Sequence, residues 1–165
     1  MKKLFFLILA SFLISVFAIA QPINGTYAIQ NTVTGKNLRP FDAGNQNGNR
    51  IVLYNHVQWK CMTWNFISTS DNTYQLKNLF TSKTFQPKEN PAKVGTTLEQ
   101  TPLSTSASQQ WEFIKTPNKS FYIRLKGSEL YITASSSETN SNIVLQAKQD
   151  KALQLWRLVE QNPSM

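Results

Sequence analysis

The chain has 165 residues, the size of a single domain, and a formal net charge of +8. His56 is the only histidine and Cys61 the only cysteine, so a histidine or thiolate metal centre lacks ligands and no intramolecular disulfide can form. The basic residues are dispersed, without the block of about five or six like charges expected of a nucleic-acid-binding tail.

Residues 1–20 have the three parts of a secretory signal. Two lysines precede an apolar run from Leu4 to Ala20, which ends in the small-residue pattern Ala-Ile-Ala. An uncleaved anchor is the alternative, because 17 apolar residues reach the lower limit for spanning a bilayer. The cleavage pattern favours removal. We therefore expect a secreted chain that begins at Gln21 and has no stable membrane insertion.

The rest of the chain contains three copies of one unit. Each copy has a tryptophan followed by a polar residue and two apolar residues, at Trp64, Trp111 and Trp156. Upstream of each tryptophan, a segment that alternates apolar and variable residues begins at Tyr27, Tyr74 and Phe121. This alternation is typical of half-buried strands. The repeats span about residues 23–70, 71–117 and 118–160.

Two further apolar landmarks align the copies. The first is Leu38, Phe85 and Leu130, each 26 residues before its tryptophan, and the second is Leu53, Leu98 and Leu145. This alignment puts the two-residue deficit of the third copy in its first turn. No stretch has a sustained period near 3.6, so we expect about four short strands per repeat and little helix. A β-propeller is not favoured, because propellers typically need four to eight blades and this chain has three repeats. Three such units around a shared axis predict an all-β fold, a β-trefoil.

The residues around the tryptophans carry a family resemblance. Gln109-Gln110-Trp111 and Gln154-Leu155-Trp156 resemble the Gln-x-Trp signature of the ricin B-type lectin β-trefoils, and Met62-Thr63-Trp64 is similar to a degenerate copy. The resemblance covers roughly residues 23–160. It implies a carbohydrate-binding module, and hence a glycan as the partner.

The resemblance also indicates which residues to compare between repeats. In sugar-binding members an aspartate follows the leucine of a Gly-Lys-x-Leu phrase, and an aromatic residue ends the next strand. In this chain the first position aligns with Arg39, Gln86 and Tyr131, and the second with Tyr54, Glu99 and Gln146. No repeat keeps the aspartate, and only repeat one keeps an aromatic platform.

The site is therefore expected in repeat one. A pyranose needs an aromatic ring for its apolar face and a few donors and acceptors for its hydroxyls. Because Arg39 can only donate, its pairing with Tyr54 favours a carboxylated or sulfated sugar. Candidate groups at the rim are Asp42, Asn55 and His56, and Trp59 is a candidate second stacking surface. The alternatives are a solvated charge for Arg39, a half-buried strand residue for Tyr54 and a loop anchor for Trp59.

The context of several other residues assigns them to the fold and not to the site. We expect Trp64, Trp111 and Trp156 in the core, Gln109 and Gln154 bonded to local backbone, and Cys61 buried as an inert thiol. A Ser-His-Asp or Cys-His arrangement would have to use His56, which lies in a polar segment, so no catalytic activity, metal or cofactor is predicted. The alternative function is a β-trefoil that serves as a protein-interaction or inhibitor scaffold.

Overall fold

A computed structural model describes residues 22–70 and 72–164. The expected signal, residues 1–20, and the expected mature start at Gln21 lie outside the described residues. Within those two ranges, the structure has no helix of sufficient length and apolar character to cross a membrane.

The described residues form twelve strands and four one-turn 3-10 helices, in three successive sets. Repeat one contains β1 (Gly25–Asn31), β2 (Asn37–Pro40), η1 (Phe41–Ala43), β3 (Ile51–Tyr54), η2 (Lys60–Met62) and β4 (Trp64–Ser70). Repeat two contains β5 (Thr73–Asn78), β6 (Thr84–Pro87), β7 (Leu98–Thr101), η3 (Ala107–Gln109) and β8 (Trp111–Lys115). Repeat three contains β9 (Phe121–Leu125), β10 (Leu130–Ala134), β11 (Ile143–Ala147), η4 (Ala152–Gln154) and β12 (Trp156–Glu160).

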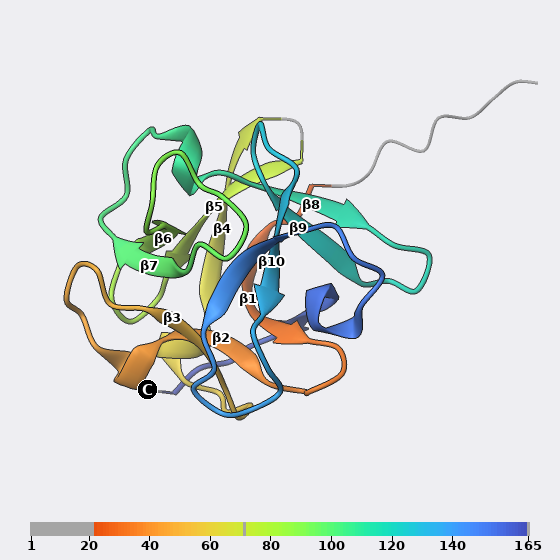
Figure 1. Ribbon diagram of the computed structural model, residues 1–165. Coiled ribbons are helices and arrows are strands. Elements are labelled where there is room, and N and C mark those ends of the chain that lie inside the picture. The colour runs from red at the N-terminus through yellow and green to blue at the C-terminus, as the bar shows by residue number, and fades with distance from the viewer. Residues whose placement is uncertain (1–21, 71, 165) are drawn as a thin grey trace, which may run out of the picture.

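Six of these strands close into a barrel (Figure 1). β1 pairs with β4 and β12, β5 with β4 and β8, and β9 with β8 and β12, all antiparallel. The other six form the hairpins β2–β3, β6–β7 and β10–β11. Closure leaves the barrel strands without free edges. The prediction of a β-trefoil built from three four-stranded repeats is confirmed.

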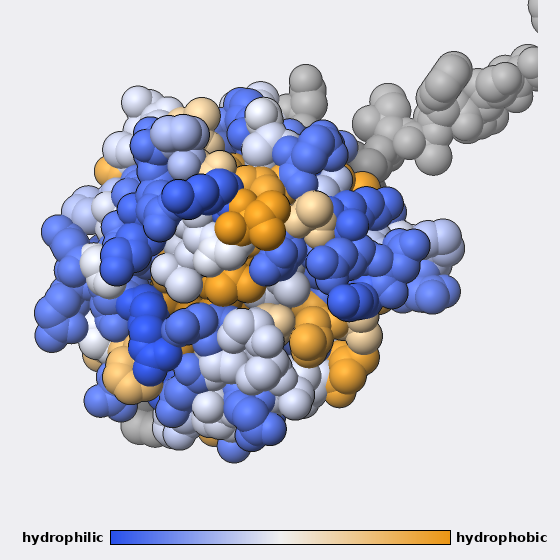
Figure 2. Space-filling model, viewed as in Figure 1, coloured by the Kyte–Doolittle hydropathy of each residue, from blue (hydrophilic) through white to orange (hydrophobic). Residues whose placement is uncertain are grey.

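The three repeated tryptophans lie at the centre of the core. Trp64, Trp111 and Trp156 are completely buried, as predicted. Trp64 Nε1 donates a hydrogen bond to the Leu38 carbonyl at 3.1 Å, and Trp156 Nε1 donates to the Ile132 carbonyl at 3.0 Å. Hydrophilic residues cover most of the face seen in Figure 2, which is consistent with burial of the aromatic residues inside.

The strand registers correct the alignment of repeat three. Ile132 lies opposite Leu145, as Leu38 lies opposite Leu53, and it accepts the tryptophan hydrogen bond 24 residues before Trp156. Leu130 is therefore not the equivalent of Leu38. Since Ile132 and Leu145 are 13 residues apart where Leu38 and Leu53 are 15 apart, the deficit lies in the β10–β11 loop and not in the first turn.

Repeat two needs a similar correction. Leu98 lies opposite Pro87, as Ile51 lies opposite Pro40, whereas Gln100 lies opposite Phe85 and takes the place of Leu53. Gln100 is fully buried, and its Nε2 donates to two carbonyls of the β2–β3 loop in repeat one. Strand side chains alternate with period two, so a slip of two residues keeps apolar residues on the same face and the sequence pattern cannot detect it.

Buried asparagines fix two of the three first turns. Asn31 and Asn78 each accept hydrogen bonds at Oδ1 from the backbone N–H groups two and three residues later. Their Nδ2 groups donate to another loop, Asn31 to the Ala152 and Leu155 carbonyls and Asn78 to the Cys61 carbonyl. Each amide therefore shapes its own turn and ties it to the segment that precedes a core tryptophan.

Candidate functional site

In repeat one, Arg39 and Tyr54 lie together at the predicted site. Arg39 on β2 is opposite Val52, and Tyr54 is two residues further along β3, so their side chains are diagonal neighbours on one face. The guanidinium carbon of Arg39 is 3.5 Å from the centroid of the Tyr54 ring. One face of the ring is thus occupied by the guanidinium group.

Arg39 is buried rather than solvated. Its exposed fraction is 5%, its Nε has no hydrogen-bond partner, and none of the ion pairs among residues 22–70 and 72–164 includes it. A buried cation without a paired anion is energetically costly. The alternative that Arg39 is a surface charge is therefore wrong.

Cys61 is close to Arg39 but does not supply the missing negative charge. The thiol is buried and free, as predicted. Burial raises its pKa above the usual range, although the neighbouring Arg39 acts in the opposite direction. At neutral pH the group next to the guanidinium is therefore a neutral thiol.

A chain of hydrogen bonds positions His56. Arg157 Nε donates to Gln30 Oε1 at 2.7 Å, Gln30 Nε2 donates to Asn37 Oδ1 at 3.1 Å, and Asn37 Nδ2 lies 2.9 Å from His56 Nδ1. Because arginine can only donate, this order makes His56 Nδ1 the acceptor at the end of the chain. The network connects β12 of repeat three to the loop that follows Tyr54.

The other predicted rim residues differ in position. Asn55 follows Tyr54 directly, is exposed, and accepts a hydrogen bond from Thr139 Oγ1 at 3.2 Å. Asp42 lies two residues after Pro40, in the loop of the β2–β3 hairpin. Tyr54 is paired with Asn37 and so lies at the other end of the hairpin. Three strand steps separate those ends by about 10 Å. The structure therefore does not bring Asp42 to the Tyr54 ring.

Trp59 lies in the same loop as Asn55 and His56 and is partly exposed. Its carbonyl accepts hydrogen bonds from Met62 N and Thr63 Oγ1, each at 3.0 Å. The Trp59 backbone therefore anchors the loop ahead of Trp64, while its indole remains partly accessible.

In repeat two, the equivalent site is filled by amide groups. Gln109 Nε2 donates to Gln86 Oε1 at 3.3 Å and to the Pro102 carbonyl at 3.0 Å, and its Oε1 accepts from Ser104 N at 2.7 Å. The strand register places Thr101, and not Glu99, at the position of Tyr54. This repeat has no aromatic platform.

Repeat three has a pocket of about 410 Å³ at the equivalent site, lined by Thr133, Val144, Gln146, Gln149, Lys151 and Leu153 among others. Gln154 Nε2 donates to Thr133 Oγ1 and to the Ala147 carbonyl, both at 2.9 Å, and its Oε1 accepts from Gln149 N at 2.7 Å. Gln109 and Gln154 thus bond local backbone, as predicted. The register places Thr133, and not Tyr131, at the position of Arg39.

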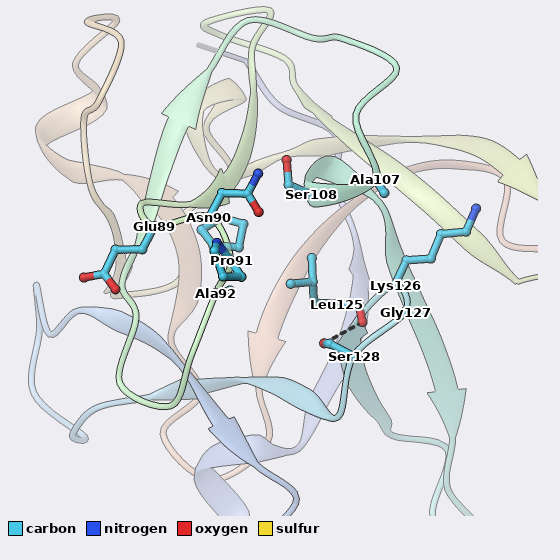
Figure 3. Close-up of a pocket in the computed structure, with 11 residues that line it drawn as sticks. Glu89, Asn90, Pro91, Ala92, Ala107, Ser108, Leu125, Lys126, Gly127 and Ser128 are labelled. Atoms are coloured by element: carbon cyan, nitrogen blue, oxygen red, sulfur yellow. Dashed lines mark hydrogen bonds between the residues drawn. The ribbon is translucent and has the colours of Figure 1, made fainter.

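A separate pocket of about 240 Å³ lies between repeats two and three (Figure 3). Pro91 and Ala92 come from the β6–β7 loop, and Leu125 and Ser128 flank the turn between β9 and β10. Ser128 Oγ donates to the Leu125 carbonyl at 2.9 Å. No aromatic ring lines this pocket, so it offers no stacking surface for a sugar.

The part of the chain that the structure describes has no cluster of three or more His, Cys, Asp and Glu side chains able to hold a metal.

Residues 58–147, more than half of the chain, match the ricin-type beta-trefoil lectin domain-like family. The chain belongs to this family. No curated protein matches the sequence.

Solved structures share the fold of this ricin-type lectin-like chain. The designed three-fold symmetric protein ThreeFoil is 19% identical, with a TM-score of 0.79 over 82% of this chain and 98% of that chain. A Macrolepiota procera ricin B-like lectin, in complex with lactose, is 17% identical, with a TM-score of 0.71 over 86% of this chain and 99% of that one. These identities show the fold alone.

A larger protein also contains this fold. An exo-beta-1,3-galactanase from Clostridium thermocellum is 20% identical, with a TM-score of 0.78 over 84% of this chain. The lectin-like chain spans only 30% of the galactanase.

The corrected registers change which residues of the lectin-like repeats are compared. The position of Arg39 is occupied by Gln86 and Thr133, and the position of Tyr54 by Thr101 and Gln146. Repeat one remains the only copy with an aromatic residue at that strand position. Nothing in the sequence indicates that Arg39 is buried, because arginine side chains are mostly exposed.

Proposed function

We propose that this chain is a secreted, non-catalytic carbohydrate-binding module whose best site is in repeat one and favours acidic glycans. Membership of the ricin-type lectin-like family supports carbohydrate binding. The lactose complex of the Macrolepiota procera lectin supports it through a shared fold. Secretion rests on the signal pattern of residues 1–20, and N-terminal sequencing of the exported protein should find Gln21 first.

The observation that carries the proposal is the buried guanidinium of Arg39, which stacks on Tyr54 but has no carboxylate partner among the described residues. Burial removes water from the cation, and the ion pairs of the described residues provide it with no carboxylate. The guanidinium group of arginine binds the oxygen atoms of a carboxylate or sulfate through charge-assisted hydrogen bonds. An acidic sugar at this site would supply the missing charge.

The geometry limits how such a sugar binds. Arg39 covers one face of Tyr54, so a sugar ring stacks on the other face or displaces the guanidinium group. Asn55 and His56 follow Tyr54 in the chain and are exposed, so they are the candidate polar groups of the rim. Trp59 provides a further aromatic surface in the same loop. Asp42 lies at the far end of the hairpin and contributes nothing to this arrangement.

Calorimetric titration with trigalacturonate, and with galactotriose as its uncharged counterpart, tests the proposal. Wild type should bind the acidic sugar more tightly. Tyr54→Ala should remove binding at this site through loss of the ring. Arg39→Lys, which keeps the charge but loses the planar fork, should weaken the preference for the acidic sugar.

Lys88→Gln is the matched charge control, because it removes one exposed cation from the β6–β7 loop. It should change binding by less than about twofold, as expected of a remote exposed charge at moderate salt. If neither Tyr54→Ala nor Arg39→Lys alters binding, the repeat-one site is wrong. If no sugar binds the folded protein, the protein-interaction scaffold becomes the better assignment.

A further inference from the structure

A pocket outside the three repeat sites lies where the β8–β9 hairpin meets the loop between β11 and β12. Its volume is about 360 Å³, within the range of about 300–1,000 Å³ typical of ligand pockets. Ile114 and Lys115 of β8 and Tyr122 of β9 line it from the hairpin. Lys148 and Asp150 line it from the loop.

Comparison of the repeats shows why the pocket has its ring here. Tyr122 pairs with Ile114, as Gln75 pairs with Ile67 and Ala28 with Val159, so these three residues are equivalent barrel positions. Ala28 is fully buried, and Gln75 donates to the Ser104 carbonyl of the adjoining loop. In repeat three, the same position carries an aromatic ring that lines a pocket.

The Tyr122 ring is held on two sides. Its hydroxyl donates to Asp150 Oδ1 at 3.4 Å, and its ring packs edge-on against Tyr131 with centroids 6.0 Å apart. Desolvation, together with the negative charge of Asp150 and the hydrogen bond to it, raises the pKa of the Tyr122 phenol. The phenol therefore remains protonated and keeps donating to Asp150 at neutral pH.

Cations without an ion-pair partner line this pocket and the one next to it. Lys148 Nζ lies 5.0 Å from the Tyr122 ring centroid, and Lys115 lines the same pocket. An adjoining pocket, which shares Asn118, Ser120 and Leu155, adds Lys119 and Arg157. None of these four cations belongs to an ion pair of the described residues, and Asp150 is the only carboxylate that lines either pocket.

We propose that this pocket is a second binding site for acidic saccharides, separate from the repeat sites. Tyr122 supplies the stacking surface for a sugar ring, and Lys115 and Lys148 pair with its carboxylate or sulfate group. A flat ring beside a hydrogen-bonding rim is the combination that a pyranose requires. The assignment does not depend on the repeat-one site, because the two share no residue.

The test is a titration of the full-length folded protein with trigalacturonate, read by calorimetry and by backbone amide NMR shifts. Each variant is first shown to be folded by circular dichroism. In a Tyr54→Ala background, trigalacturonate should still shift the amides of Ser120, Lys148 and Asp150. Adding Tyr122→Ala should weaken this binding by about tenfold, and Tyr122→Phe should weaken it far less because the ring remains.

Lys148→Gln keeps the ring and changes an exposed side chain, so it remains informative even if Tyr122→Ala does not fold. It should reduce the dependence of affinity on salt, whereas the remote Lys88→Gln should not. If Tyr54→Ala alone abolishes all binding, this second site is wrong and the repeat-one proposal stands. If Tyr122→Ala abolishes binding and Tyr54→Ala does not, the second site stands and the repeat-one proposal fails.

Discussion

Three tryptophans that look identical in the sequence have different bonding. Trp64 and Trp156 donate hydrogen bonds to carbonyls of the second strand in their own repeats, but Trp111 Nε1 is buried without a partner. Its ring lies 5.1 Å, centroid to centroid, from Phe85, as the Trp64 ring also does. A buried donor without an acceptor is a cost that Trp111 carries and the other two do not.

This difference predicts unequal effects of the same substitution. Trp64→Phe removes a hydrogen bond and leaves the Leu38 carbonyl unpaired, whereas Trp111→Phe removes none. The free energy of unfolding should therefore fall by about 1 kcal/mol more for Trp64→Phe, as measured by urea denaturation. Trp111→Ala should still cost about 3–5 kcal/mol because it truncates a large core side chain. Equal losses for the two Phe variants would contradict the assigned bonding.

The residues of the two candidate sites differ in how far the sequence indicates them. Arg39 and Tyr54 could be selected from the sequence because they occupy positions comparable between the repeats. Asp42 is close to Arg39 in the sequence, but the hairpin places it at the opposite end from Tyr54. The sequence does not single out Tyr122, because its pocket is completed by Lys148 and Asp150, which belong to a different loop.

At the level of elements, the first turn of each repeat is built in one of two ways. Asn31 and Asn78 hold their turns and a neighbouring loop with buried amides, while the turn of repeat three starts after Leu125. The apolar residue suits repeat three because Leu125 packs with the core, at 7% exposure. The turn is therefore held by a buried amide in two repeats. In the third, the Ser128 hydroxyl donates to the Leu125 carbonyl and Leu125 itself is buried.

We expect Asn78→Leu to destabilise the protein although it copies the choice of repeat three. The change leaves the Cys61 carbonyl and the N–H groups of Phe80 and Thr81 without their partner. The free energy of unfolding should fall by about 2 kcal/mol or more in chemical denaturation. Asn47→Leu, in an exposed loop, should stay within about 0.5 kcal/mol of wild type. A neutral Asn78→Leu would show that the turn needs no amide.

For the whole molecule, barrel closure joins the first strand to the last. β12 pairs with both β1 and β9, so repeat three completes the sheet that repeat one begins. The three repeats share one core, in which all three tryptophans are buried. They are therefore expected to unfold together and not as independent units.

Removal of β12 tests this dependence. A chain that ends before Trp156 lacks one barrel strand and one of the three core rings, and it exposes the edges of β1 and β9. It should show no cooperative thermal transition by circular dichroism, whereas a chain that ends after Glu160 should melt as wild type does. A cooperative transition in the shorter chain would mean that two repeats fold without closure.

The sequence alone predicts the number of repeats, the strands and the core tryptophans. These features follow from local alternation and from spacing along one chain, which are both visible in the sequence. It also determined that repeat one alone keeps an aromatic residue at the end of its third strand.

The strand registers, the burial of Arg39 and the pocket at Tyr122 become visible only in the folded chain. A register shift of two residues leaves every side chain on the same face, so the sequence pattern allows either Leu130 or Ile132 as the equivalent of Leu38. The pairing of Ile132 with Leu145 of β11 distinguishes them. Burial of a charge and assembly of a pocket depend on segments distant in sequence, such as the loop that brings Lys148 and Asp150 to Tyr122. Closure of the barrel brings those segments together, and local sequence patterns do not predict such contacts.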